Sequence, residues 1–295
     1  MFGFRSTRIS TDDRSAPGIV PVALPLPLDA SLFRHHFTGL LDMMESTGGA
    51  DAHLAALAAK RHHVEWFLSE LDSGAAGEGA LESVLAIMFT ARRRLFPALC
   101  GLGTDTVNAA LRQLRESRPD PGTALQALVD RMPGAPDADR QSIKQSAKLR
   151  RAAWDFAAEL LHFADPEGMP LMTRWVWDQG TQSGALREFI RGNDSPREVP
   201  FSNDPGLFEG ARAWLVEQLR GEGIYRDLPL WVDLVLAQAY LGYFRSMTEG
   251  SLGADFGRGV PPHEQLRRLL GIDAEPGTRH DRVKKTIGTA QPGTH

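Results

Sequence analysis

Apolar residues recur every three or four positions along most of the chain, which is the spacing that places them on one face of a helix. Strict alternation of apolar and polar residues, the pattern of a strand, does not persist over several runs. The pattern therefore predicts a mainly α-helical, bundle-like globular fold of about eight to ten helices. The predicted helices cover about residues 29–44, 51–73, 80–96, 138–163, 205–220, 227–247 and 261–270, with shorter ones around 107–114, 125–129 and 183–190.

Glycine and proline divide these helices into groups. Three prolines interrupt the apolar stretch 19–28, which favours an extended arm over a helix. The run Met132-Pro133-Gly134-Ala135-Pro136-Asp137 is the strongest break in the first half of the chain. The predicted divisions are an extended N-terminal arm (1–28), an N-terminal helical subdomain (29–132), a C-terminal helical subdomain (138–273) and a disordered C-terminal tail (274–295).

The composition is typical of a soluble globular protein, with 42% hydrophobic and 24% charged residues. With 33 basic and 37 acidic residues the net charge is −4, so the molecule as a whole does not attract nucleic acid or anionic lipid. No uncharged apolar run approaches the ~18 residues of a membrane-spanning helix, and the prolines of 19–28 argue against a signal peptide. The single cysteine, Cys100, excludes an intramolecular disulfide, and we expect a cytoplasmic location.

The most specific metal-binding pattern is Glu159-Leu160-Leu161-His162, a Glu-x-x-His motif that places both side chains on one helix face. A carboxylate-bridged di-iron site requires a second copy of the motif, and the sequence contains none. His162 lies in an apolar stretch, so a core histidine with one hydrogen bond is the alternative. A metal site centred on Glu159 and His162 stays one hypothesis, but no cofactor is predicted.

Nucleophilic catalysis has little support in the sequence. There is no Gly-x-Ser-x-Gly motif, and Cys100 follows a predicted helix end without a histidine nearby in the chain. The stretch Gly101-Leu102-Gly103-Thr104 lacks the lysine of a phosphate-binding loop. The chain contains no complete catalytic constellation, and the balance favours a protein without catalytic activity.

Basic residues form local clusters although the total charge is acidic. One cluster lies near the end of the 80–96 helix, which Pro97 is predicted to close, and another lies in the polar first half of the 138–163 helix. The residues that would bind nucleic acid are Arg92, Arg93, Arg94, Lys148, Arg150 and Arg151. Stacking of bases on Trp175 and Trp177 would add to phosphate contacts. Alternatively, each cluster is a helix end or a solvated helix face.

The stretch from Met132-Pro133-Gly134 through Glu159 to Arg174-Trp175-Val176, about 45 residues, resembles the hairpin-and-helix region of helix-hairpin-helix DNA glycosylases. The second hairpin glycine of that family is replaced here by Pro136. Met172-Thr173-Arg174 has no acidic residue where the family carries its catalytic aspartate. The resemblance therefore implies no catalytic residue in this chain.

The most distinctive local feature lies between residues 165 and 178, where Met172, Arg174, Trp175 and Trp177 occur in a proline-punctuated segment. Tryptophan and arginine are enriched at protein interfaces, so an exposed segment would bind a partner or a small anionic ligand. If the segment is buried, it would seal the core between two helical halves. Arg174 needs a carboxylate or water in either case. The candidate carboxylates are Asp155, Glu159 and Asp178.

Three functional hypotheses follow. The first is a cytoplasmic accessory or scaffold protein that binds a protein partner through Met172, Arg174, Trp175 and Trp177, without chemistry of its own. The second is a protein that binds nucleic acid through its basic helix faces. The third is a metal-dependent helical enzyme. A membrane partner is not expected, and the sequence leaves the oligomeric state open.

Overall fold

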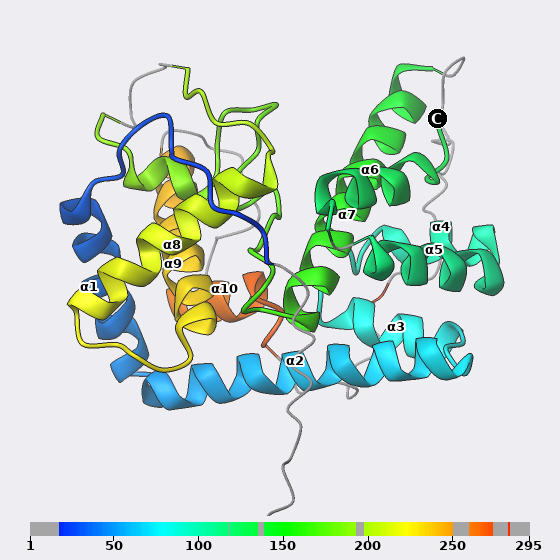
Figure 1. Cartoon of the computed structure of the whole chain (residues 1–295), viewed down its shortest axis with the longest axis horizontal. Helices are drawn as coiled ribbons and strands as arrows, with labels where there is room; N and C mark the ends of the chain where they lie inside the picture. The colour runs from blue at the N-terminus through cyan, green and yellow to red at the C-terminus, as the bar shows by residue number, and fades with distance from the viewer. Residues whose placement is uncertain are drawn as a thin grey trace, which may run out of the picture.

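The computed structural model describes residues 18–117, 119–134, 139–192, 198–249, 260–273 and 283 (Figure 1). Over these residues the protein is all-helical, as predicted, and isolated pairing of Asp178 with Ser183 is the only strand-like feature there. The described α-helices are α1 (Ala30–Glu45), α2 (Gly49–Ser73), α3 (Glu78–Ala86), α4 (Leu95–Leu102), α5 (Thr104–Glu116), α6 (Pro121–Asp130), α7 (Arg140–Ala164), α8 (Pro205–Gly221), α9 (Leu228–Glu249) and α10 (Pro262–Leu269), and a short 3-10 helix, η1, spans Ala185–Phe189.

Aspartates begin several of these helices. Asp29 precedes α1, and its carboxylate accepts a hydrogen bond of 2.7 Å from the backbone N–H of Ser31, a group that the helix itself leaves unpaired. Asp120, Asp139 and Asp204 have the same role before α6, α7 and α8. Because these signals are local, most predicted helices lie within a few residues of the observed ones.

The predicted helix over residues 80–96 is wrong in its second half. α3 ends at Ala86, turns follow over 87–94, and α4 begins at Leu95. Pro97, which the sequence predicts to close a helix, lies in the first turn of α4, where a backbone N–H has no helical partner to lose. Met88 is fully buried without being helical, so an apolar spacing that resembles a helix arises here from tertiary packing.

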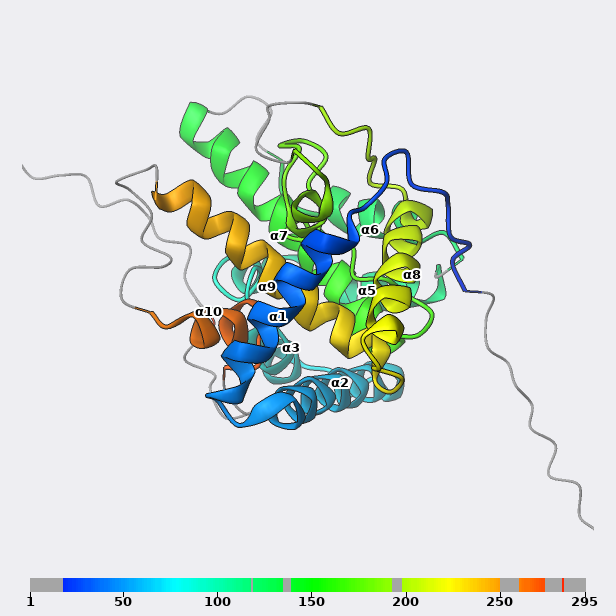
Figure 2. The ribbon, with the colours of Figure 1, turned by 90° about the vertical axis from the view of Figure 1, so that its left-hand side faces the viewer.

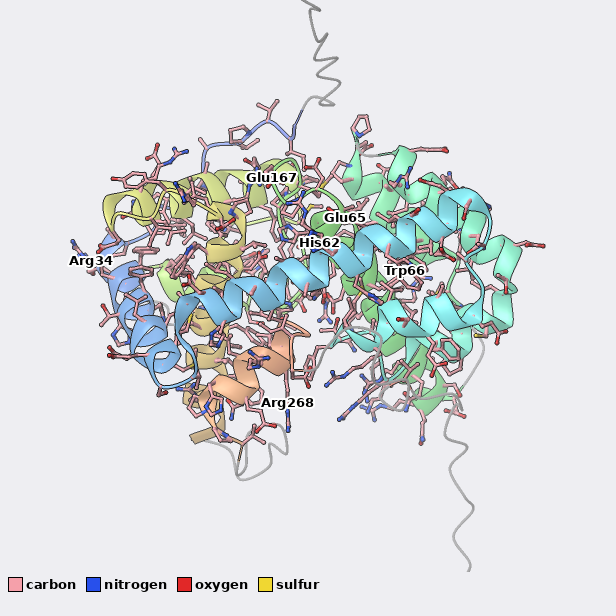
Figure 3. All side chains as sticks on the ribbon, turned by 90° about the horizontal axis from the view of Figure 1, so that it is seen from below. Arg34, His62, Glu65, Trp66, Glu167 and Arg268 are labelled. Atoms are coloured by element: carbon pink, nitrogen blue, oxygen red, sulfur yellow. The ribbon has the colours of Figure 1, made fainter. Side chains whose placement is uncertain are left out.

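Helix α2 is 25 residues long and crosses the molecule from one side to the other (Figures 1 and 3). Figure 1 shows α1, α8, α9 and α10 on one side, and α3 to α6 on the other. Helix α7 packs against α2, α5 and α6. The residues of α7 that are buried begin at Ala152, so its first half is exposed and its second half belongs to the core, as its sequence predicts.

Elements of the two predicted subdomains pack against each other. Helix α1 packs on α9 and η1, and α7 packs on α6. A hydrophobic cluster contains buried side chains from both parts of the chain. The break between them, at 132–137, falls partly outside the described residues, and the division into subdomains stays a prediction.

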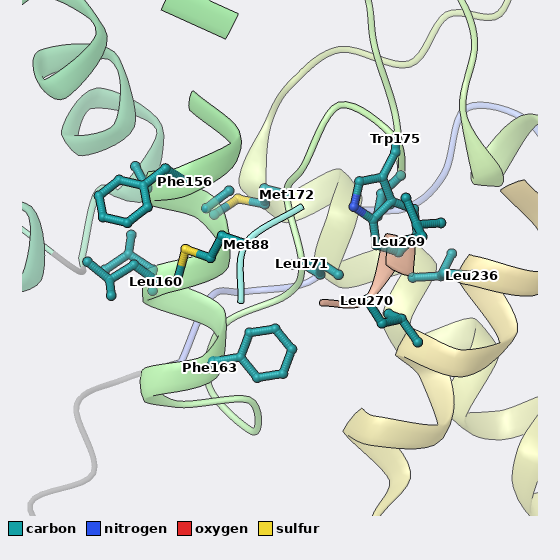
Figure 4. Close-up of a cluster of buried hydrophobic side chains, with 14 of the residues drawn as sticks. Met88, Phe156, Leu160, Phe163, Leu171, Met172, Trp175, Leu236, Leu269 and Leu270 are labelled. Carbon is teal, nitrogen blue, oxygen red and sulfur yellow. The ribbon is translucent and has the colours of Figure 1, made fainter. Parts of the chain in front are cut away.

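The segment that connects α7 to α8 is irregular, as its prolines predict. Through η1 it packs against α9 and α1. Gly184 has a φ of 130°, and a Cβ at this position would lie 2.6 Å from the carbonyl oxygen of Val176. Glycine therefore allows the chain to fold back closely on itself. This fold-back accompanies the burial of Trp175 within the hydrophobic cluster (Figure 4).

The described part of the N-terminal arm, residues 18–28, contains no helix and passes beside α8 (Figure 2). The backbone N–H of Val22 donates a hydrogen bond of 2.9 Å to the carbonyl of Gly206. A Cβ at Gly210 would lie 2.2 Å from the carbonyl oxygen of Val22, so only glycine permits this approach. The arm is thus fitted to α8 by backbone contacts.

Both ends of the chain extend beyond the described residues. Residues 1–17 and the predicted disordered tail lie outside them, except Val283, whose side chain is buried in the hydrophobic cluster. None of the described helices combines the length and the apolar character that crossing a membrane requires.

Candidate functional site

A pocket of about 340 Å3 is lined by the turns 87–94, by α7 and by the segment that follows α7. The pocket, termed the basic pocket below, is lined by Phe89, Thr90, Arg93, Arg94, Lys148, Arg151, Ala152, Asp155 and Arg174. Five of these side chains are cationic, and they come from three separate stretches of the sequence. Figure 3 shows side-chain nitrogen atoms gathered between α10 and α3. The fold therefore concentrates positive charge in a protein whose net charge is negative.

Four of the six residues predicted to bind nucleic acid line the basic pocket, namely Arg93, Arg94, Lys148 and Arg151. The other two, Arg92 and Arg150, do not line it. Arg92 is buried over the ring of Phe89, and one of its guanidinium nitrogens lies 3.6 Å from a carboxylate oxygen of Asp273. Arg150 lies on a different face of α7 and pairs with Asp130 at 2.6 Å.

The cations of the basic pocket are mostly unpaired. The side chains of Arg93, Arg94 and Lys148 are exposed and form no hydrogen bond or ion pair with the part of the chain that the structure describes. The Nε of Arg151 donates to the carbonyl of Ala147 in its own helix, at 3.1 Å. Unpaired like charges that converge on a concave surface raise the local concentration of anions.

Arg174 and Asp155 meet at the buried end of the basic pocket. The guanidinium of Arg174 pairs with Asp178, one of the partners considered from the sequence. The backbone N–H of Arg174 donates to Asp155 Oδ1 at 2.8 Å. Asp155 is only 5% exposed, and this burial raises the pKa of its carboxyl to about 7, although the hydrogen bond and the charge of Arg174 oppose the shift. The carboxyl can therefore hold or release a proton near neutral pH.

The aromatic patch predicted as an interface is buried. Met172, Trp175 and Trp177 are only 1%, 5% and 2% exposed, and the indole N–H of Trp177 donates to the carbonyl of Phe201 at 3.1 Å. The structure thus shows the core seal, the second of the two interpretations, and corrects the expectation of exposed aromatic anchors. The physical reason is the fold-back at Gly184, which encloses the patch between helices. A protein partner stays a prediction, without these side chains on the surface.

Glu159 and His162, the predicted metal ligands, lie in a buried charge network, which we define as Lys60, Glu159, His162 and Asp233. The Nζ of Lys60 lies 2.7 Å from Glu159 Oε2 and donates to the carbonyl of Leu270 at 2.8 Å. Burial raises the pKa of Glu159, and the positive charge of Lys60 opposes this shift. The network thereby joins α2 and α7 to the end of α10.

His162 has a partner at each ring nitrogen. Nδ1 lies 2.7 Å from the carbonyl oxygen of Met169, and Nε2 lies 2.9 Å from a carboxylate oxygen of Asp233. Among the described residues, no group of three or more His, Cys, Asp or Glu side chains is placed to hold a metal ion. Both side chains of the Glu-x-x-His motif thus have partners within the fold, and the metal site stays a prediction.

The sequence-based reasoning missed Lys60. Its position carries a signal, because Leu57, Val64 and Phe67 lie three or four residues apart on the buried face of α2 and Lys60 falls on the same face. A lysine in such a stripe predicts a buried partner, since an unpaired buried charge is strongly unfavourable. The identity of the partner, 99 residues away, is not visible in the sequence.

Comparison with known proteins adds nothing to this geometry. The chain matches no protein-family model, and neither the curated proteins nor the solved structures contain a significant match to it. The resemblance to DNA glycosylases stays a prediction, and the basic pocket is the basis for a functional proposal.

Proposed function

We propose that the protein binds nucleic acid through the basic pocket, by contacts to phosphate groups. The observation that carries this proposal is the convergence of five cations from three stretches of sequence on one pocket. Three of them, Arg93, Arg94 and Lys148, are unpaired within the described residues and are free to bind an anion.

The side chains of the basic pocket favour phosphate over other anions. Four of the five cations are arginines, whose planar guanidinium groups donate two parallel hydrogen bonds to phosphate oxygens. A volume of about 340 Å3 is suited to a compact ligand group and not to an extended acidic protein surface. The net charge of −4 provides no general attraction, so binding depends on this local concentration of cations.

Phosphate contacts position a nucleic acid but carry no sequence information directly. We therefore expect binding with little base specificity and with a strong dependence on salt, because each neutralised phosphate releases counterions. A cytoplasmic accessory role without catalysis, as the sequence suggests, is compatible with such binding.

The experiment measures the affinity for labelled single-stranded and duplex oligonucleotides by fluorescence anisotropy at several salt concentrations. The logarithm of the association constant should fall against the logarithm of salt concentration with a slope of about −2 or steeper. In the double variants Arg93→Gln/Arg94→Gln and Lys148→Gln/Arg151→Gln, binding should weaken about tenfold or more and the slope should become shallower by about 1 or more.

The matched control is Arg115→Gln/Arg150→Gln, which removes the same charge outside the basic pocket. These arginines pair on the surface with Asp72 and Asp130, at 2.8 and 2.6 Å, so their loss should affect folding little. Binding that is absent at low salt, or that falls equally in the control and the pocket variants, would contradict the proposal.

A further inference from the structure

The shape of the basic pocket restricts what can enter it. Arg93, Arg94 and Lys148 are exposed, whereas Ala152 and Asp155 are buried, so the pocket leads from a cationic rim to an inner end within the protein. Internal phosphodiesters are distributed along a strand, and a strand that follows a surface presents them one after another. The end of a strand can enter such a pocket with its last phosphate foremost.

The charges of the basic pocket distinguish a terminal phosphate from an internal one. A terminal phosphate monoester carries up to two negative charges and three acceptor oxygens, whereas an internal phosphodiester carries one charge. Of the five cations that line the pocket, Arg174 is already paired with Asp178, and the other four are matched to the more highly charged group.

The inner end of the basic pocket supplies a different contact. The carboxyl of Asp155 receives the backbone N–H of Arg174 at Oδ1, and Oδ2 has no hydrogen-bond partner among the described residues. An anion beside this group favours its protonated form, which donates a hydrogen bond to a phosphate oxygen. The cations thus neutralise the ligand, and the carboxyl contributes a donor when it is protonated.

We infer that the basic pocket binds a terminal phosphate monoester of a nucleic-acid strand in preference to an internal phosphodiester. The inference rests on the proposed function. In this arrangement Asp155 and Arg174 face the terminal phosphate, and the cations at the rim bind it and the neighbouring phosphodiester. A free nucleoside monophosphate carries the same chemical group, so the test has to separate these two sources.

The test compares one short single-stranded sequence in three forms: with a 5′-phosphate, with a 3′-phosphate, and with hydroxyl groups at both ends. The label is placed internally, and the binding of a nucleoside 5′-monophosphate is measured separately by isothermal titration calorimetry. At least one phosphorylated form should bind about tenfold more tightly than the hydroxyl form. This preference should be lost in Lys148→Gln/Arg151→Gln and retained in Arg115→Gln/Arg150→Gln.

Each outcome separates the inference from the proposed function. Equal binding of all three forms, with all three weakened in the pocket variant, would overturn the inference and leave nucleic-acid binding intact. If the monophosphate alone binds and no oligonucleotide does, the monoester site stands on its own and the nucleic-acid function fails. If none of these probes binds, both fail. Because the phosphorylated and hydroxyl forms are compared on the unaltered protein, the result does not depend on the folding of a variant.

Discussion

The buried charge network and the basic pocket both include residues of α7, but their charged side chains differ in burial and in pairing. In the buried charge network, Lys60 and Glu159 form an ion pair of 2.7 Å whose side chains are almost inaccessible to solvent. In the basic pocket, Arg93, Arg94 and Lys148 are exposed and unpaired within the described residues. Helix α7 contributes Lys148, Arg151, Ala152 and Asp155 to the pocket, and Glu159 and His162 to the network.

The difference follows from the cost of removing a charge from water. A buried charge without a partner destabilises a fold by several kcal/mol, and each member of the network has an ion pair or a hydrogen bond. An exposed cation keeps its hydration and can remain unpaired at little cost, and surface pairing adds little stability. We conclude that the network serves the fold and that the basic pocket is the place where charge is available for a ligand.

A short segment after α10 connects these two regions. The carbonyl of Leu270 accepts a hydrogen bond from Lys60 in the network. A Cβ at the next residue, Gly271, would lie 1.7 Å from the carbonyl oxygen of Ile87, at the start of the turns that carry the pocket arginines. Asp273 pairs with Arg92 in the same turns. The segment 270–273 therefore contacts both the buried charge network and the turns that carry the pocket arginines.

The largest expected effect comes from Lys60→Met, which leaves Glu159 buried without its cation. The free energy of unfolding should fall by about 3–5 kcal/mol, because one member of a buried pair is lost and the Leu270 carbonyl loses a donor. Denaturant unfolding measures this loss, and oligonucleotide affinity of the folded variant should change little.

The double variant Lys60→Met/Glu159→Leu separates the loss of pairing from the loss of lysine packing. Replacing both members of a buried pair by apolar side chains is often close to neutral, so at least half of the lost stability should return. A double variant that is less stable than Lys60→Met would contradict the view that the unpaired carboxylate of Glu159 causes the loss in the free energy of unfolding.

Gly271→Ala should have the next largest effect and should act on both regions. Gly271 has a φ of 71°, and the added Cβ would meet the carbonyl of Ile87, so the turns 87–94 must move. We expect a loss of about 2–3 kcal/mol in the free energy of unfolding and a severalfold weaker affinity for oligonucleotides. Denaturant unfolding and fluorescence anisotropy measure the two effects.

Gly223→Ala is the matched control for this prediction. Gly223 has a similar φ of 85°, but a Cβ there would contact nothing within 4 Å. Its substitution should cost about 1 kcal/mol from backbone strain and should leave affinity unchanged. If both alanine variants behave alike, the close approach to Ile87 does not support the pocket.

The sequence predicts the helices well where local signals determine them. Asp29 and Asp139 begin helices because their side chains bind the first free N–H groups, and this information lies within a few residues. The helix prediction fails at 87–94, where Met88 is buried by distant parts of the chain and its position matches the spacing of a helix. The local pattern does not distinguish an apolar residue on the buried face of a helix from one that tertiary packing buries in a turn.

The candidate site is only partly predictable for the same reason. The clusters around Arg93 and Lys148 are visible in the sequence, but their convergence with Arg174 depends on how three separate segments pack. The aromatic residues near Arg174 are equally suited by composition to a surface or to a core. Their burial follows from the fold-back at Gly184, which periodicity does not reveal.

The smallest effect concerns the pH dependence of stability. The carboxyl of Asp155 has a pKa of about 7 in the folded protein, against about 3.9 for an unfolded aspartate. Between about pH 4 and pH 7 the folded protein holds a proton that the unfolded chain has released, so the stabilising contribution of this group is lost as the pH rises through this range. Asp155→Asn does not titrate, and its side-chain oxygen still accepts the Arg174 N–H.

Denaturant unfolding across a pH series tests this prediction. The free energy of unfolding of Asp155→Asn, relative to the unaltered protein, should increase between pH 5 and pH 8 by about 1 kcal/mol or more. The groups that face Asp155 are the same in both proteins and cancel in this difference; they are the five pocket cations, Arg174 among them, together with Glu159, Asp178 and Tyr240. A difference that stays constant would mean that Asp155 is ionised throughout, and the inner end of the pocket would then repel a phosphate group instead of donating to it.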